Sequence, residues 1–161
     1  MDLMSYIDKG GIIVYILITL NIIGFTIILI KAVALTRLNK SLQIHANNII
    51  KQTNSKELVK SKVLNFVKSY ESGLSTIKNI ATIAPLLGLL GTVIGVLEAF
   101  DAISKSGLGD PSVFSHGISI ALITTIAGLI VAIPHYICYN YFIGILDTAE
   151  LKLNEKVLEQ L

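Results

Sequence analysis

The chain has 161 residues, of which 53% are hydrophobic and 15% are charged, with a net charge of +2 and a mean hydropathy of +0.72. A chain of this composition cannot keep most of its surface in water, which indicates an integral membrane protein. The small net charge gives no support for nucleic-acid binding. The single cysteine, Cys138, excludes an internal disulfide and a cysteine-based metal site.

The first apolar segment, residues 10–30, contains no Asp, Glu, Lys or Arg. About 20 apolar residues of helix cross the hydrocarbon core of a bilayer, so this segment predicts a first transmembrane helix after an external N-terminus, residues 1–9. Ala32-Val33-Ala34 resembles a signal-peptide cleavage site, but the run is longer than a signal core and the residues before it carry almost no net charge. We therefore expect the segment to be retained.

The basic residues predict the orientation of the chain. Residues 31–78 carry nine of the 13 Lys and Arg residues, whereas residues 101–112 carry only Lys105. Positively charged loops stay in the cytoplasm. This predicts an N-terminus outside, a cytoplasmic helical loop at 31–78, an external turn at 101–112 and a cytoplasmic helical tail at 139–161.

Apolar residues recur at helical spacing in the loop and again in the tail, which predicts helical extensions of the membrane helices. The first stripe continues the first helix inward, the second follows the polar residues 52–55, and the third lies in the tail. The stripes are Leu35, Leu38, Leu42, Ala46 and Ile49; Val59, Val63, Phe66, Val67 and Tyr70; and Leu146, Leu151, Leu153 and Val157. The stripes serve either packing within one subunit or a groove for a partner.

Two further charge-free runs follow, residues 79–97 and residues 111–146. Each is long enough to cross a bilayer, and the residues between them suit a short external turn. They predict transmembrane helices at 79–100 and 113–138. The expected fold class is an all-α integral membrane protein with three transmembrane helices and a C-terminus inside.

Small residues line one face of each of these two helices. Small faces let membrane helices approach closely, and polar side chains on them can bond across the contact. Thr92 and Thr125 fall at comparable depths, where each hydroxyl either bonds to its own helix or lines a polar pore. The residues expected to pack the helices and line a pore are Gly88, Gly91 and Gly95 on the second helix and Ala121, Thr124, Gly128 and Ala132 on the third.

Polar residues also occur at the ends of these helices. Glu98 is expected at an outer mouth, where external acidic residues would concentrate cations; the alternative is that its side chain extends to the lipid headgroups. His116 and His135 lie towards opposite ends of the third helix, where interfacial hydrogen bonds are expected and a proton relay is the alternative.

Two segments carry a family resemblance. APLLGLLGTVIG at 84–95 and ALITTIAGLIVAIP at 121–134, followed by Tyr139-Asn140, resemble the ExbB/TolQ/MotA family of proton-channel subunits. The order of the predicted spans and the inward loop agree over the rest of the chain. The motifs, with the short loop and tail, are more similar to the ExbB and TolQ branches than to MotA.

The resemblance implies a homopentamer in the bacterial inner membrane, without a cofactor, that surrounds the single-span helices of an ExbD- or TolR-like partner. Proton flow would drive movement that a TonB- or TolA-like protein passes to the outer membrane. Thr92 and Thr125 match the family's pore threonines, and Thr124 adjoins them on the same path. Many relatives carry a glutamate where this chain has Ile120, so an aspartate of the partner helix would supply the titrating group.

The sequence leaves an alternative function open. Small-residue faces also explain a non-conducting oligomeric scaffold, which only proton flux would distinguish from a channel. A small-molecule transporter is disfavoured because the sequence shows no inverted repeat and no pair of broken helices. Enzymatic activity has no support, since no nucleophile–base pair, metal-ligand cluster or phosphate-binding loop occurs.

Overall fold

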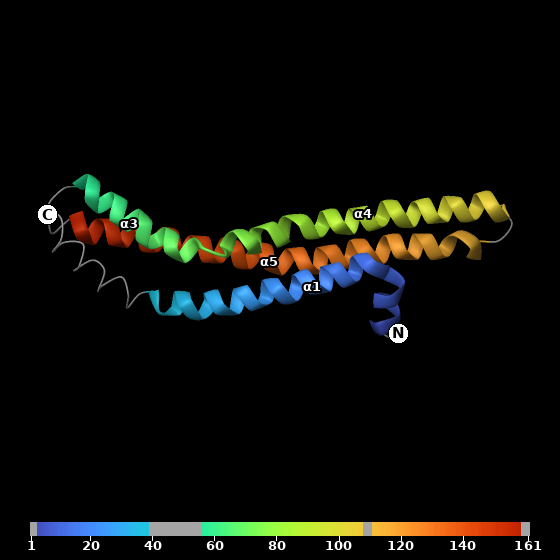
Figure 1. The fold of residues 1–161 in the computed structure, drawn as a ribbon, viewed down its shortest axis with the longest axis horizontal. Helices are drawn as coiled ribbons and strands as arrows, with labels where there is room; N and C mark the ends of the chain where they lie inside the picture. The colour runs from blue at the N-terminus through green and yellow to red at the C-terminus, as the bar shows by residue number, and fades with distance from the viewer. Residues whose placement is uncertain (1–2, 39–55, 108–110, 159–161) are drawn as a thin grey trace. The chain divides into compact units, whose positions relative to one another are not determined.

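A computed structural model describes residues 3–38, 56–107 and 111–158 of the chain. In these ranges the chain forms four α-helices (Figure 1). The helices are α1 (Leu3–Thr36), α3 (Lys56–Glu71), α4 (Leu74–Ser106) and α5 (Ser112–Leu158). The predicted all-helical fold is therefore confirmed.

Three of these helices are long and apolar enough to cross a membrane. The segments are Met4–Thr36, Leu74–Ser106 and Phe114–Val157, with hydropathies of 2.7, 2.2 and 2.2. Each exceeds the roughly 20 residues that a bilayer core requires, so the helix ends do not mark the membrane boundaries. The span limits and the orientation inferred from the sequence stay predictions.

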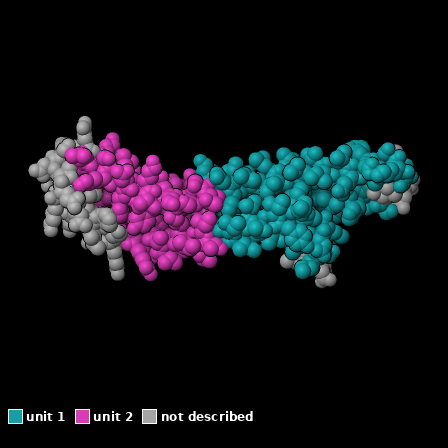
Figure 2. Space-filling view, in the orientation of Figure 1, with its two compact units in different colours: residues 1–25, 78–136 teal, residues 26–77, 137–161 magenta. Residues whose placement is uncertain are grey.

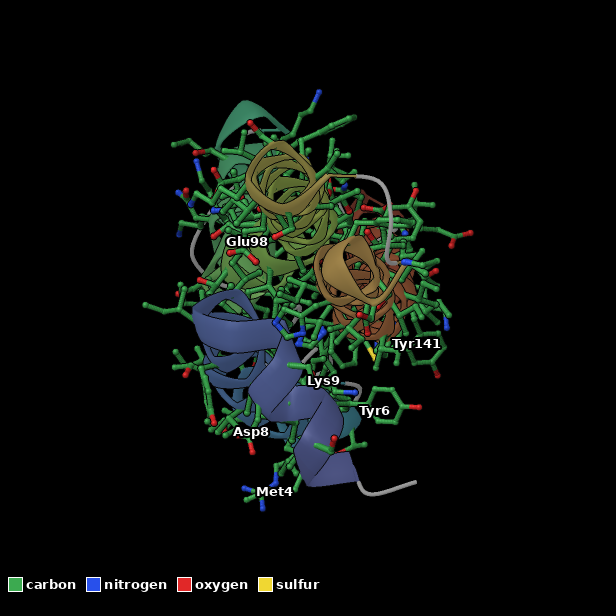
Figure 3. All side chains as sticks on the ribbon, turned by 90° about the vertical axis from the view of Figure 1, so that its right-hand side faces the viewer. Met4, Tyr6, Asp8, Lys9, Glu98 and Tyr141 are labelled. Atoms are coloured by element: carbon green, nitrogen blue, oxygen red, sulfur yellow. The ribbon has the colours of Figure 1, made fainter. Side chains whose placement is uncertain are left out.

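Helix α1 is broken near its start by Gly11. Its backbone angles, φ 61° and ψ −153°, lie in a region that is essentially restricted to glycine. The hydroxyl of Tyr15 donates a hydrogen bond of 3.0 Å to Asp8 Oδ1 across the break. Figure 1 shows the resulting change of direction, and Figure 3 labels Met4, Tyr6, Asp8 and Lys9 on the short segment that precedes it.

The chain divides into two compact units, coloured separately in Figure 2. Unit 1 comprises residues 1–25 and 78–136, and unit 2 comprises residues 26–77 and 137–161. Helices α1, α4 and α5 each contribute to both units.

Unit 1 packs the first part of α1 against α4 and α5. Its buried apolar cluster consists of Ile13, Leu17, Ile80, Ala84, Val131 and Ala132. Large apolar side chains cover the outer surfaces of the same helices; Leu97 is 68% exposed and Ile130 is 64% exposed. An apolar surface of this extent is stable against lipid or against other chains rather than water.

Unit 2 holds most of the described stripe residues in one core. The core includes Leu35, Leu38, Val59, Val63, Val67, Leu146, Leu153 and Val157, with Phe66 and Tyr70 packed against it. Packing within one subunit, one of the two alternatives, is therefore confirmed for these residues. The assignment of Leu151 to the tail stripe is wrong, because its side chain is 70% exposed: it lies five residues after Leu146, on the opposite side of the helix. Leu42, Ala46 and Ile49 lie outside the described residues.

A lysine closes the junction between α3 and α4. Lys31 Nζ donates a hydrogen bond of 3.1 Å to the carbonyl oxygen of Tyr70, in the last turn of α3. Gly73 follows with a φ of 84°, the left-handed conformation that commonly ends a helix. The cation both satisfies a terminal carbonyl and lies at the negative end of the helix dipole.

We expect Lys31→Met to destabilise the end of α3 by about 1–2 kcal/mol, because the Tyr70 carbonyl loses its charged donor. Hydrogen exchange should show faster exchange of the amides in the last turns of α3. Lys60→Met, at an exposed position of the same helix, is the matched control. Equal exchange in both variants would remove Lys31 from this role.

Candidate functional site

Helices α4 and α5 of unit 1 meet along a seam of small residues. A β-carbon added to Gly95 would lie 2.5 Å from the carbonyl oxygen of Gly117 and 2.7 Å from the amide nitrogen of Ala121. One added to Gly128 would lie 2.7 Å from the carbonyl oxygen of Ala84. Real β-carbons do not approach backbone atoms so closely, so only glycine permits this contact.

The small residues predicted from the sequence lie in or beside this seam. Gly88 faces Thr125 and Gly128, and a β-carbon at Gly91 would overlap the side chain of Thr124. Ala132 belongs to the buried cluster of unit 1. Within one chain these residues have the close packing expected of membrane helices.

Thr92 and Thr125 lie opposite each other on the two helices. Their Oγ1 atoms are 2.5 Å apart, within a hydrogen bond in which either hydroxyl can be the donor. The carbonyl oxygen of Ala121 lies 3.2 Å from Thr92 Oγ1 and 3.1 Å from Thr125 Oγ1, and Gly88 O lies 3.2 Å from Thr92 Oγ1. Each hydroxyl therefore reaches its own helix, as in the first alternative, and also the other threonine, while the lining of a pore stays a prediction.

The hydroxyl pair has more acceptor capacity than donor capacity. Two hydroxyls carry two hydrogens and four oxygen lone pairs. When one hydroxyl donates to the other, one lone pair is used, and the second hydrogen goes to a carbonyl such as Ala121 O. Three lone pairs remain, and both side chains are only partly buried. The pair can thus accept a hydrogen bond from an approaching O–H group.

Thr124 was expected on the same proton path as Thr92 and Thr125, but its hydroxyl does not join theirs. Its side chain is fully buried, and its hydroxyl donates within α5 to Ile120 O at 3.0 Å or to Ala121 O at 3.1 Å. Successive residues of a helix point about 100° apart, so Thr124 and Thr125 cannot share one direction. Thr124 packs under Gly91 in the seam, and the polar position is left to Thr125.

Ionisable groups are scarce around the threonines. The described parts of 79–97 and 111–146 contain no Asp, Glu, Lys or Arg, and the residue five positions before Thr125 is the apolar Ile120. Glu98 is exposed on α4 (Figure 3). Lys105 Nζ lies 2.6 Å from Asp101 Oδ2 and forms an ion pair with it. Both side chains are more than half exposed, so this pair stabilises the helix little.

The two histidines differ from each other. His116 is exposed. His135 is fully buried in unit 1, and its Nδ1 lies 2.7 Å from the carbonyl oxygen of Val131, so the hydrogen bond described for it lies within α5; its depth in the membrane stays a prediction. The sequence held a signal for this burial, because His135 continues the buried spacing of Gly117, Ala121, Thr124, Gly128 and Val131 along α5.

Comparison with known proteins assigns the chain to a family. Residues 29–155 match the model of the MotA/TolQ/ExbB proton channel family. The chain belongs to this family. The resemblance drawn from the two motifs is thereby confirmed, and members of this family are channel and motor subunits rather than enzymes.

Individual relatives are similar over shorter segments. The chain is 47% identical over 75 residues to a putative biopolymer transport protein ExbB homolog of Methanothermobacter thermautotrophicus, and 44% identical over 66 residues to biopolymer transport protein exbB1 of Vibrio cholerae. It is 38% identical over 92 residues to biopolymer transport protein ExbB of Aquifex aeolicus. These segments cover 47%, 40% and 57% of this chain and 26%, 29% and 57% of the respective relatives.

Proposed function

We propose that this chain is the wall subunit of an ExbB-like, proton-driven motor. In this proposal five copies assemble in the bacterial inner membrane around a single-span, ExbD- or TolR-like helix that carries an intramembrane aspartate. The observation that carries the proposal is the hydroxyl pair of Thr92 and Thr125, two partly exposed donors and acceptors within the stretches of α4 and α5 that contain no Asp, Glu, Lys or Arg.

The pair suits both protonation states of a carboxyl group. A protonated carboxyl would donate its hydrogen to a free lone pair of Thr92 or Thr125. After the proton leaves, the hydroxyl that donates to Ala121 O would rotate and donate to the carboxylate instead, while the other hydroxyl still donates to its threonine partner. A charged carboxylate in an apolar region is unfavourable without such donors, so the pair lowers the cost of releasing the proton.

The titrating group would come from the partner. The described spans of α4 and α5 lack a carboxylate between Asn79 and Leu97 and between Pro111 and Leu146. The threonine hydroxyls do not ionise at physiological pH, so they can solvate a relay but cannot store its proton. Gly88, Gly91, Gly95, Ala121 and Gly128 would hold the two helices of the wall together.

The moving complex would act on a TonB-like protein and energise outer-membrane transport. The relatives named as biopolymer transport proteins support this branch, and a TolQ-like role in envelope maintenance uses the same wall and the same partner geometry. The basic residues of 31–78 support a cytoplasmic loop and an external N-terminus. Glu98 would lie at the outer mouth.

Proton flux through reconstituted liposomes tests the proposal. Liposomes that contain this chain alone should show little proton leak under an imposed potential. Liposomes that also contain the single-span partner should conduct, and replacing the partner's intramembrane Asp by Asn should abolish that conduction at nearly constant side-chain size. Conduction by this chain alone would contradict the proposed division between wall and partner, and no flux in an intact complex would favour a non-conducting scaffold.

Glu98→Gln should lower the flux of the same complex by no more than about threefold, because a charge at the mouth raises the local proton concentration without carrying the relay. The reduction should shrink at high salt, where exposed charges are screened. Complete loss of flux with normal assembly would instead make Glu98 the primary acid.

A further inference from the structure

Helices α1 and α5 of unit 1 leave an apolar groove between them. Its volume is about 500 Å³, and its walls include Leu17 and Ile18 on α1 and Ile126 and Ile130 on α5. Both isoleucines of the α5 wall are more than half exposed. They belong to the charge-free run 111–146, so lipid or another helix must cover the groove.

Asn21 is the one amide side chain among the residues that line this groove. It is partly exposed, and its Oδ1 atom is buried without a hydrogen-bond partner. Such an atom is unfavourable in an apolar region. A lipid acyl chain has no group that can bond to the amide, whereas polar side chains commonly bond between membrane helices. The groove therefore fits a helix that carries a polar side chain at the depth of Asn21.

Helix α4 carries such a side chain on the face opposite its seam with α5. Leu89 and Val93 each lie two residues, about 200° around the helix, from Gly91 of the seam. Exposed residues recur on this outer face at spacings of three and four, and Thr82 is the polar member of the set. This outer stripe of α4 consists of Thr82, Leu86, Leu89, Val93, Leu97 and Phe100.

Thr82 and Asn21 lie at nearly the same depth in unit 1. A β-carbon on Gly24 would lie 3.0 Å from Ile80 Cδ1, so Gly24 and Ile80 are at one level. Asn21 precedes Gly24 by three residues and Thr82 follows Ile80 by two, which displaces them by about 4.5 Å and about 3 Å along their helices. Both displacements have the same sense, because α1 and α4 run in opposite directions in unit 1 (Figure 1).

We infer that the groove between α1 and α5 receives the outer stripe of α4 from a second copy of this chain, with Asn21 of one copy hydrogen-bonded to Thr82 of the next. This inference rests on the proposed assembly of several copies. Rotation about an axis normal to the membrane leaves each residue at one depth, so the two side chains meet without a shift along that axis. The two surfaces differ from each other, so the contact is heterologous and can close a ring.

Thr82 can bond to the amide without losing its own hydrogen bond. A threonine hydroxyl has one hydrogen and two lone pairs, and Thr82 uses the hydrogen to donate to Lys78 O at 2.9 Å. Its oxygen can still accept from the amide N–H of Asn21, or the hydroxyl can turn and donate to Oδ1. The apolar residues of the outer stripe would cover the exposed α5 wall of the groove.

Oxidative cross-linking of the full chain in membranes tests this contact. Cys138 is the only cysteine, so Cys138→Ser provides a parent chain without a thiol. In that parent, Asn21→Cys combined with Thr82→Cys should give covalent dimers and larger products that a reducing agent reverses. Thr19→Cys with Thr82→Cys is the matched control, because Thr19 lies two residues from Asn21 on the exposed side of α1. We expect at least about fivefold more dimer than in the control, since two cysteines join only when their Cα atoms come within about 7 Å.

A second pair leaves both polar residues in place. Ile18→Cys with Leu86→Cys lies about one turn further along the groove and along the outer stripe, and the same contact should cross-link it. Dimer yields at the level of the control in both pairs would overturn the inference and leave the groove to lipid or to a partner helix. An internal disulfide within single chains would overturn it as well.

Native mass spectrometry of the reduced variants separates this inference from the proposed function. Several copies without a cross-link would remove the contact and leave the proposed wall subunit standing. A single copy in every preparation would contradict both. Cross-linked rings without proton flux would keep the contact and favour the non-conducting scaffold.

Discussion

Thr92→Val and Thr125→Val are each expected to lower partner-dependent proton flux at least tenfold while the complex still assembles. Valine keeps the branched shape of threonine and removes only the hydroxyl. A hydrogen bond to a charged group contributes about 1.5–3 kcal/mol, which corresponds to roughly a 10- to 100-fold change in a rate or an equilibrium. Flux into liposomes and native mass spectrometry of the same preparations measure activity and assembly together.

A double variant shows whether the hydroxyls of Thr92 and Thr125 act together or independently. Because the two hydroxyls bond to each other, the loss in Thr92→Val with Thr125→Val should be much less than the product of the single losses. Thr19→Val is the control, since its exposed hydroxyl donates to Tyr15 O in its own helix. Normal flux in both single variants would exclude the hydroxyls from the relay.

Gly91→Leu and Gly128→Leu should each destabilise the chain by about 3 kcal/mol or more and thereby prevent assembly. A β-carbon at Gly128 already meets Ala84 O at 2.7 Å, and one at Gly91 overlaps the buried Thr124 side chain. A leucine adds three further carbons where no space exists, so α4 and α5 must separate. Thermal unfolding followed by circular dichroism reports the loss, and native mass spectrometry reports the number of subunits.

Gly144→Leu is the matched control for this second prediction. Gly144 also lies in a helix, but a β-carbon there would meet nothing within 4 Å. Leucine is a better helix former than glycine, so this variant should unfold at the same or a higher temperature. Folded monomers of Gly91→Leu would place the critical glycine contact between copies instead of within one chain.

The helices could be predicted from the sequence because charge-free runs have few other stable conformations in a bilayer. Their ends could not. Helix α4 begins at Leu74 and α5 continues to Leu158, because apolar residues beyond the charge-free runs, such as Leu74 and Val157, pack in the core of unit 2. Hydropathy reports the thickness of the apolar region, whereas helix ends depend on local breaks such as Gly73 and Gly11.

The residues of the candidate site could be predicted from the sequence, but the directions in which their side chains point could not. Thr124 and Thr125 are chemically identical neighbours, and only the packing of Gly91 against Thr124 shows which hydroxyl is buried in the seam. Leu151 was assigned to a stripe by composition although its spacing places it on the outside. The spacing along α5 indicates that His135 is buried, but it does not indicate that the ring packs against Gly24, which is distant in sequence.

The hydrogen bond between Thr92 and Thr125 is reversible in direction, since either oxygen can be the donor. A hydroxyl pair that can solvate a nearby proton with either orientation of its hydrogen bond gives proton flow no preferred direction. In the proposed motor, rectification would then originate outside this pair, in the different acidity of the two compartments or in an asymmetric rest position of the partner helix. If the proton gradient were inverted, protons would pass along the proposed channel wall in the reverse direction as readily, unless the partner prevented it.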